Sequence, residues 1–365
     1  TPTGHTKLYP PGHQLTNRMS IQTSEARELL VKLVRIPSVS GNEEPCARQL
    51  ASFFERHDRE VWLDEAGNVR APADDGVLLT SHIDTVPGDI PVHVETDQEG
   101  RDVLWGRGSV DATGSLAAMA TAAVRTGASF VGVVGEEVDS RGSRHVVETR
   151  EGTPDTVING EPSGWNGITL GYRGILGGTY VGASESGHSS RPENNAVQDA
   201  MDWWRRVESK FEHDEYVPVF ERVTCKPVGF DGGLSGDGLT VEATMEVQLR
   251  VPPSYTTDTV REIADGCLER GTVNWHDMVD PVMESPRTPV ARAFRAAIRE
   301  HDGDPRMLRK TGTSDMNVFA NAWGVPTVSY GPGDSNLDHA PDERLPLPEY
   351  DKSVAVLAGV TERLL

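Results

Sequence analysis

Short, mainly apolar runs alternate with helix-like segments in the first half of the chain, and this alternation limits the folds that it can adopt. The apolar runs at residues 77–80, 130–134 and 156–159 lack the polar–apolar alternation of a strand with one solvated face. Such runs are typical of strands that are covered on both sides. Helical patterns lie before and between them, at about residues 23–36, 46–57 and 112–125. Strands that alternate with helices predict an α/β sheet whose functional site lies at the ends of the strands.

The pattern changes near Gly174 and changes back near Pro286. Between these points the expected order is strand, helix, strand, strand, helix, strand, which is the ferredoxin-like order of an α+β domain. The expected strands are residues 177–183, 223–230, 239–250 and 272–276, and the expected helices are residues 196–209 and 257–268. After the second change, the α/β pattern returns. The expected helices are residues 290–301, 314–321 and 348–364, and the expected strand is residues 325–330.

We therefore predict a discontinuous α/β domain that is interrupted by a smaller domain. The first part of the α/β domain would be residues 19–173, the inserted domain residues 174–285, and the second part residues 286–365. Residues 1–18 are polar and rich in proline and glycine, so we expect a disordered extension there.

The chain is strongly acidic. It has 56 Asp and Glu against 35 Lys and Arg in 365 residues, a net charge of −21, and only six of the basic residues are lysines. No basic face is available for phosphates, which argues against nucleic-acid binding. The acidity is either ordinary solubility charge or an adaptation to a salt-rich cytoplasm in which screening makes self-repulsion tolerable. We favour the halophilic interpretation because acidity and lysine depletion occur together.

Other sequence features indicate a cytoplasmic protein without a membrane segment. No apolar run approaches the ~20 residues that a membrane helix requires, and no secretory signal pattern is present. The cysteines Cys46, Cys225 and Cys267 are too few and too far apart for a disulfide framework or a cysteine zinc cluster.

Five short segments place a histidine or a carboxylate directly after an expected strand or turn. They are residues 81–87, 106–111, 135–137, 159–161 and 337–339. Each segment alone is compatible with a structural role. Together they supply two imidazoles and several carboxylates, a mixed nitrogen and oxygen set that suits two zinc-like divalent ions.

Individual residues in these segments have alternative roles. His82 and Asp84 are two residues apart, so an extended segment points both to one side and lets Asp84 orient the imidazole; a surface turn is the alternative. Asp111 can bridge two metal ions or cap the helix that begins at Ala112, and the two roles are compatible. Glu136 and Glu137 are adjacent, so one can bind metal while the other acts as a general base; a solvated loop pair is the alternative.

The order and spacing of these motifs resemble the zinc-dependent aminoacylase, acetylornithine deacetylase and succinyl-diaminopimelate desuccinylase family, from about Ile21 to the end of the chain. The resemblance implies a zinc-aminopeptidase-like catalytic domain with an inserted lid or dimerisation domain, two divalent ions per subunit, zinc or else cobalt, and a homodimer. It also implies roles for the site residues. His82 and Glu161 would hold one metal, Glu137 and His339 the other, Asp111 would bridge them, Asp84 would orient His82, and Glu136 would be the general base.

Finer motifs resemble one branch of this family, the hydrolases that release lysine or ornithine from the C-terminal glutamate of a small acidic amino-group carrier protein in lysine or arginine biosynthesis. These motifs are residues 160–165, 171–174, 310–317 and 330–333. One departure is visible, since Thr113 stands where the family usually has lysine.

Several residues are candidates for substrate contacts. By resemblance, His188 would stabilise an oxyanion, in the active site of the partner subunit, and Asn194 would face substrate. Arg250 suits bidentate recognition of an α-carboxylate. Gly312 and Thr313 precede a helix N-terminus, where backbone N–H groups can bind a carboxylate.

The sequence thus favours an enzyme, a two-metal hydrolase that cleaves an amide to a basic amino acid. The alternatives within the class are an acetylornithine deacetylase, a succinyl-diaminopimelate desuccinylase or a dipeptidase. A metal-dependent binding protein without activity is the alternative from another class, but it would be expected to lack a ligand or Glu136.

Overall fold

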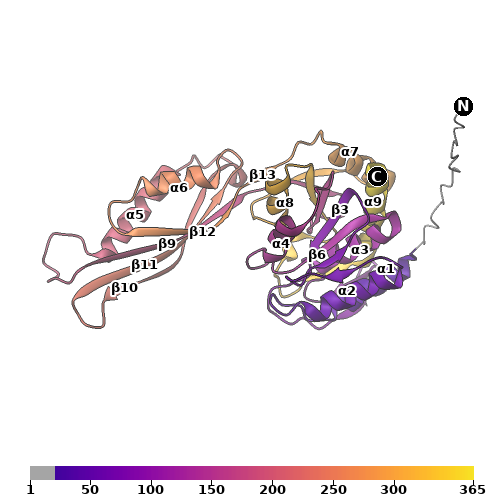
Figure 1. Cartoon of the computed structure of the whole chain (residues 1–365), viewed down its shortest axis with the longest axis horizontal. Helices are drawn as coiled ribbons and strands as arrows, with labels where there is room; N and C mark the ends of the chain where they lie inside the picture. The colour runs from indigo at the N-terminus through magenta and orange to yellow at the C-terminus, as the bar shows by residue number, and fades with distance from the viewer. Residues whose placement is uncertain (1–20) are drawn as a thin grey trace, which may run out of the picture.

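The computed structural model describes residues 21–365, which form two modules (Figure 1). The large module is built on a nine-stranded sheet in the order β1-β2-β6-β3-β7-β15-β8-β13, with β14 also paired to β8. These strands are β1 (Trp62–Leu63), β2 (Val69–Ala71), β3 (Asp74–His82), β6 (Ala128–Val133), β7 (Val157–Gly160), β8 (Gly167–Tyr172), β13 (Val282–Met283), β14 (Arg306–Lys310) and β15 (Thr327–Tyr330). The central strands β6, β3, β7 and β15 run parallel, whereas β2 pairs antiparallel with β6 and β13 pairs antiparallel with β8, so the sheet is mixed.

Helices cover both faces of this sheet. The larger hydrophobic core joins one face to α1 (Thr23–Val34), α2 (Glu44–Arg56), α3 (Thr113–Thr126), α7 (Pro289–Glu300) and α9 (Leu347–Leu364). A smaller core on the other face includes residues of α4 (Arg141–Thr149) and α8 (Asp315–Trp323). The predicted alanine-rich helix is α3, and nearly all its residues are buried, because small side chains let it pack between the sheet and its neighbouring helices.

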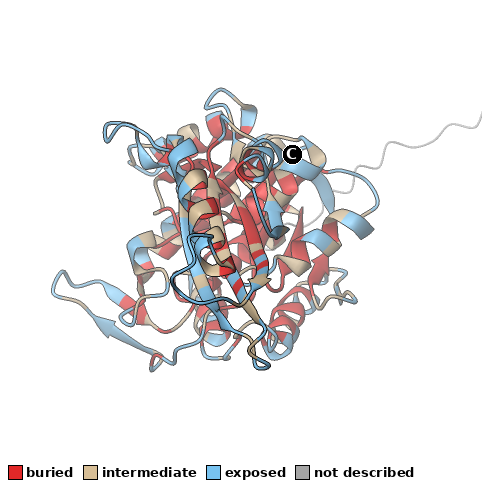
Figure 2. Cartoon of the chain, turned by 90° about the vertical axis from the view of Figure 1, so that its left-hand side faces the viewer, coloured by how far each residue is buried: buried red, intermediate tan, exposed pale blue. Residues whose placement is uncertain are grey.

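The small module comprises β9 to β12, within residues 174–279. Its four antiparallel strands lie in the order β10-β11-β9-β12. The strands are β9 (Gly174–Glu185), β10 (Thr224–Leu234), β11 (Thr240–Val251) and β12 (Thr272–Val279), and the helices α5 (Ala196–Lys210) and α6 (Thr257–Asp265) share their core. The strand and helix order is therefore the one predicted from the sequence. Buried residues fill the large module, whereas much of this module is exposed (Figure 2).

Several elements have no clear sequence signal. A third sheet, in the order β16-β5-β4, consists of β4 (His93–Thr96), β5 (Asp102–Trp105) and β16 (Arg344–Pro346), and β4 is exposed along its whole length. Short, exposed strands lack the apolar pattern by which strands are predicted. Two short 3-10 helices, η1 (Val219–Glu221) and η2 (Ser335–Leu337), complete the described elements.

Two expectations about segments outside the core have different outcomes. The extension predicted at residues 1–18 lies outside the described residues. Within residues 21–365, no helix combines the length and the apolar character needed to cross a membrane.

Candidate metal centre and active site

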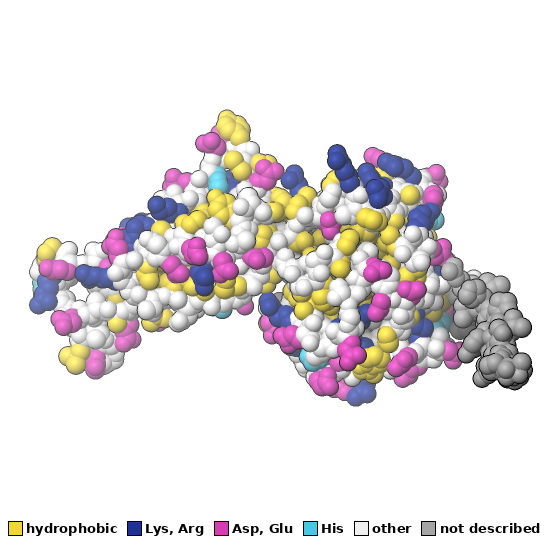
Figure 3. Space-filling view, turned by 45° about the horizontal axis from the view of Figure 1, so that its top comes forward, with side chains coloured by type: hydrophobic (Ala, Val, Ile, Leu, Met, Phe, Trp, Pro, Cys, Tyr) yellow, Lys and Arg dark blue, Asp and Glu magenta, His cyan; other side chains and the backbone are white. Residues whose placement is uncertain are grey.

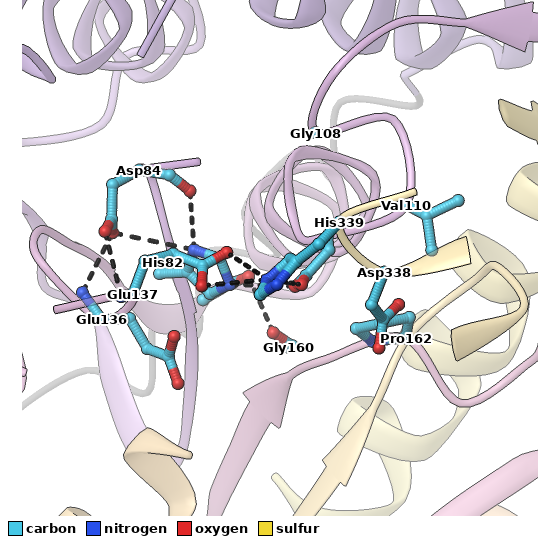
Figure 4. A network of polar contacts seen from close by, with 12 residues as sticks. His82, Asp84, Gly108, Val110, Glu136, Glu137, Gly160, Pro162, Asp338 and His339 are labelled. Carbon is cyan, nitrogen blue, oxygen red and sulfur yellow. Dashed lines mark hydrogen bonds and ion pairs between the residues drawn. The ribbon is translucent and has the colours of Figure 1, made fainter. Parts of the chain in front are cut away.

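The five predicted ligand residues come from a strand end and from loops at one end of the central sheet. His82 is the last residue of β3, Glu137 follows β6, and Glu161 directly follows β7. Because β6, β3 and β7 are adjacent and parallel, these side chains meet at one edge of the sheet. Asp111 precedes α3, and His339 follows η2. Figure 4 shows His82, Glu137 and His339 close together.

Asp111 lies between the two imidazoles. Its Oδ1 is 3.3 Å from Nε2 of His82, and its Oδ2 is 3.2 Å from Nε2 of His339. Nε2 of His339 also lies 3.1 Å from Oε2 of Glu137. Each oxygen of Asp111 therefore faces a different histidine, which is the arrangement expected of a carboxylate that bridges two cations.

Glu136 and Glu161 face the same cavity. It has a volume of about 480 Å³ and is lined by Asp111, Glu136, Glu137, Glu161, Tyr172, Arg309, Lys310, Thr311, Gly312, Thr313, Ser335, Asp338 and His339. The Oε1 atom of Glu161 is buried and has no hydrogen-bond partner among the described residues. A buried carboxylate oxygen without a donor is costly unless a cation binds it.

Asp84 supports the site differently from the prediction. Nδ1 of His82 lies 2.8 Å from the backbone carbonyl oxygen of Asp84, which is hydrogen-bond distance. The carboxylate of Asp84 is farther from Nδ1, at 3.7 Å. That carboxylate instead accepts hydrogen bonds from the backbone N–H groups of Glu136 and Glu137, both at 3.1 Å, and from the hydroxyl of Ser40 at 2.7 Å. The predicted orientation of His82 is thus provided by the main chain of Asp84, and the side chain of Asp84 fixes the turn that carries the two glutamates.

Burial and mutual charge shift the pKa values of the groups in this cluster. Burial raises the pKa of Glu161 to about 8, and it raises the pKa of Glu136 well above its ordinary value, with the charge of Glu161 adding to the effect. The hydrogen bond to Asp111 raises the pKa of His339 to about 9, against the effect of burial. Burial alone would lower the pKa of His82, but Asp111, Glu136 and Asp84 raise it well above normal. The buried carboxylates therefore require positive charge close by, from protons or from cations.

The donor set fits divalent metal ions. One ligand atom each from His82, Asp111 and Glu137 lies within 4.8 Å of the others. His339 lies next to two of these carboxylates, and Glu161 has an oxygen without a partner among the described residues. With these two residues, the set comprises two imidazoles and three carboxylates. Such nitrogen and oxygen ligands suit zinc and similar ions.

Glu343 holds the loop that carries Asp111, and the sequence analysis missed it. Its side chain is fully buried and accepts hydrogen bonds from the backbone N–H groups of Gly108, Val110 and Asp111, at 3.1, 2.8 and 3.0 Å. Arg107 adds an ion pair at 2.8 Å. The alternative role of Asp111 as a helix cap is wrong, since the N-cap of α3 is Ala112 and no side chain caps the helix. Asp111 is therefore not held in place by a capping hydrogen bond, and Glu343 fixes its loop instead. Glu343 follows no apolar run, so the signal that located the other carboxylates was absent.

Lys310 and Asp338 form a second feature of the cavity wall. Lys310 Nζ donates a hydrogen bond to the backbone carbonyl of Pro162 at 2.5 Å and lies 3.9 Å from Asp338. Burial raises the pKa of Asp338 to about 8, with the charge of Asp111 as a further cause. Lys310 is the first residue of the motif at residues 310–317 that the sequence analysis singled out.

The structure brings some of the predicted substrate residues to the cavity. Gly312 and Thr313 line it, and Arg250 donates a hydrogen bond to the Thr313 hydroxyl at 2.9 Å. Ser314 caps α8, in a capping box with Asn317.

His188 and Asn194 lie elsewhere in this chain. They line a separate cavity of about 700 Å³ in the small module. His188 contacts Ser190 there, and Asn194 donates a hydrogen bond to Asp202 at 2.9 Å. Asn195 is the residue that caps α5. Within one chain, His188 and Asn194 are therefore not part of the candidate metal centre.

The protein has a mixed α/β sheet, and histidines and carboxylates at its strand ends share one cavity. This combination is typical of metal-dependent hydrolases. The profile of the peptidase family M20/M25/M40 matches residues 78–363, and the chain belongs to this family.

Curated relatives and solved structures agree with this assignment. The LysW-lysine hydrolase of Deinococcus radiodurans is 41% identical over 93% of this chain and 97% of its own length. The putative LysW-lysine/LysW-ornithine hydrolase of Thermococcus kodakarensis is 37% identical over 94% of this chain and 93% of its own. Among solved structures, an M20 family metallo-carboxypeptidase from Sulfolobus solfataricus has a TM-score of 0.74 at 20% identity and covers 93% of this chain and 99% of its own. At that identity, the structural likeness concerns the fold.

Proposed function

We propose that the protein is a two-metal amidohydrolase that releases lysine, ornithine or both from the C-terminal glutamate of an amino-group carrier protein, in lysine or arginine biosynthesis. The observation that carries the proposal is the position of Asp111, with one carboxylate oxygen toward His82 and the other toward His339. The names of the relatives supply the substrate class, since they are LysW-lysine and LysW-ornithine hydrolases that match over almost the whole chain.

The residues of the site divide into metal ligands and a proton carrier. His82 and Glu161 would hold one ion, Glu137 and His339 the other, and Asp111 would bridge them. When bound, the ions supply Lewis-acid polarisation of the scissile carbonyl and make water acidic enough to act as a nucleophile near neutral pH. We infer that zinc is the ion, with cobalt as a substitute.

Glu136 would take the proton from the attacking water and return it to the leaving amine. It is half-buried and lines the cavity, and the Asp84 carboxylate accepts a hydrogen bond from its backbone N–H. A carboxylate held beside the reacting water in this way is suited to general acid–base catalysis.

Arg250, Gly312 and Thr313 would bind the α-carboxylate of the amino acid that leaves. The half-buried guanidinium of Arg250 and the Thr313 hydroxyl are already joined at one edge of the cavity.

Assays on two substrates test this function. We expect purified enzyme with zinc to release lysine or ornithine from the carrier-linked form much faster than from the N-acetyl form. The reverse preference would support the alternative of an acetylornithine deacetylase.

We also propose that the two modules are domains, with boundaries near residues 174 and 285, and that the small module serves as a lid and a dimer contact. Large apolar side chains are exposed on its strands and turns, among them Val181, Val228, Phe230 and Leu234. A homodimer would cover such side chains, and it would also let His188 and Asn194 reach the site of the partner subunit.

The acidic surface belongs to the same proposal. Acidic side chains are spread over both modules (Figure 3), and the net charge is −21. We infer a cytoplasmic enzyme adapted to high salt, where screening lets it approach an acidic carrier protein.

A further inference from the structure

Three arginines gather where the small module joins the large one. Arg173 is the single residue between β8 and β9. Arg250 pairs in register with Ile175 of β9 and with Thr224 of β10, and Arg222 comes two residues before Thr224. All three therefore lie at the same end of the second sheet.

No carboxylate pairs with any of these three guanidinium groups among residues 21–365, although acids outnumber bases in this chain. Arg173 bonds only to neutral oxygens: the backbone carbonyls of Thr311, Val219 and Arg222 and the hydroxyl of Thr224. Within the described part of the chain, the side chain of Arg250 bonds only to the Thr313 hydroxyl. The side chain of Arg222 has no hydrogen bond or ion pair to any described residue, and its Nε is buried without a partner among them.

The cluster carries uncompensated positive charge. Burial, together with the neighbouring charges of Arg250 and Arg222, lowers the pKa of Arg173 to about 10. Elsewhere in the chain, arginines such as Arg27, Arg70 and Arg107 each pair with a carboxylate. An anion between these arginines would relieve their repulsion and supply the missing acceptors.

The proposed substrate carries two anions of the right kind. Glutamate has two carboxyl groups, and only one of them enters the scissile amide. One free carboxylate therefore remains on the acyl side, and the α-carboxylate of lysine or ornithine lies on the leaving side. The cluster has two guanidinium groups whose donors are largely unused, those of Arg222 and Arg250.

We propose that Arg222 is a specificity-determining residue that binds the free carboxylate of the acyl-side glutamate, while Arg250 binds the leaving amino acid. This inference rests on the proposed function. Arg222 thereby selects glutamyl-linked substrates over acyl groups that lack a carboxylate, such as acetyl. A site built around a polar group discriminates strongly against a substrate without its partner, because the guanidinium is then left unpaired.

The test compares two small substrates that differ only in this carboxylate: glutamyl-lysine, and the same compound with the free carboxyl of glutamate converted to an amide. The linkage uses the lysine α-amine, and both the α- and the γ-glutamyl isomers are assayed. In the wild type, kcat/KM should be at least tenfold higher for the free acid. Arg222→Gln should remove most of this preference by lowering kcat/KM for the acid alone, and Arg222→Lys should restore it in part.

The amide substrate also reports folding, because its turnover should be unchanged in the Arg222 variants. Arg205→Gln is the matched control, since Arg205 lies on α5 in the same module, is exposed and, among the described residues, pairs only with Asp202. It should leave both substrates unaffected.

Two other results have different meanings. If the wild type cleaves glutamyl-lysine and Arg222→Gln keeps its full preference for the acid, or loses both activities equally, the role of Arg222 is wrong and the proposed function stands. If the wild type cleaves N-acetyl-lysine but neither glutamyl isomer, the proposed function is wrong, and the inference about Arg222, which rests on it, is wrong as well.

Discussion

The carboxylate of Asp84 accepts a hydrogen bond from the backbone N–H of Glu136 at 3.1 Å. This bond connects the loop after β3 to the residue that we assign as general base. The other oxygen of the Asp84 carboxylate does the same for Glu137. One side chain thus sets the position of both glutamates relative to His82. We draw four predictions from the site and its surroundings.

Asp84→Asn should disturb this turn. An asparagine must present its NH₂ group to one of the two N–H donors, and the clash would displace a glutamate. Residues that support metal ligands typically contribute ~10–100-fold to metal affinity or activity, so we expect a loss of that size in zinc titration and in kcat/KM. Ser40→Ala removes only the hydroxyl bound to the same carboxylate, and its effect should be much smaller. Equal losses in the two variants would contradict this role of Asp84.

Glu136→Gln should separate metal binding from chemistry. The amide keeps the size of the side chain but cannot accept a proton, and general bases contribute roughly 10²–10⁴-fold to rates. We expect kcat to fall by that factor, while metal analysis finds an unchanged zinc content. Unchanged turnover would rule out Glu136 as the base.

Metal-free protein should lose stability as the pH rises. The pKa of His339 is raised from 6.5 to about 9, and that of Glu161 from 4.5 to about 8. Both groups hold protons in the folded state that the unfolded chain has already lost, so the free energy of unfolding falls with pH, for His339 between pH 6.5 and 9.

Thermal unfolding across this window, with and without a chelator, checks the prediction. Zinc requires deprotonated ligands, so its addition should release protons and should stabilise the protein more at the alkaline end. A chelated protein that became more stable with rising pH would contradict the assignment.

Glu343→Gln should weaken both the fold and the metal centre. Its carboxylate holds the loop before Asp111, and breaking a buried ion pair costs about 3–5 kcal/mol. Urea unfolding should show a loss of roughly this size, and zinc affinity should fall with it. Glu349→Gln is a suitable control, because Glu349 also accepts two backbone N–H groups, from Trp165 and Gly333, but does not line the cavity. It should destabilise the fold without changing zinc affinity.

The sequence predicted the central elements well because their signals are local. Apolar runs marked β3, β6 and β7, and each of these strands ends next to one of the candidate ligands. The resemblance to a known family then assigned roles to the ligands. Glu343 and the contacts of Asp84 escaped prediction because they depend on backbone donors far along the chain. Those donors are brought together only when the sheet is assembled. The arginine cluster escaped for the same reason, since Arg173 and Arg250 are 77 residues apart in sequence and meet through the pairing of β9 with β11.

The junction at Arg173 has a mechanical consequence. A single residue separates β8, whose last residue Tyr172 lines the cavity, from β9, which runs the length of the small module. The small module is therefore attached to the cavity wall through Arg173, and a second short link at residues 280–281, between β12 and β13, returns the chain to the large module. A small rotation about these two links would move the distant β10–β11 turn by a much larger distance. A spectroscopic label on that turn would report any such rotation when the cavity is occupied.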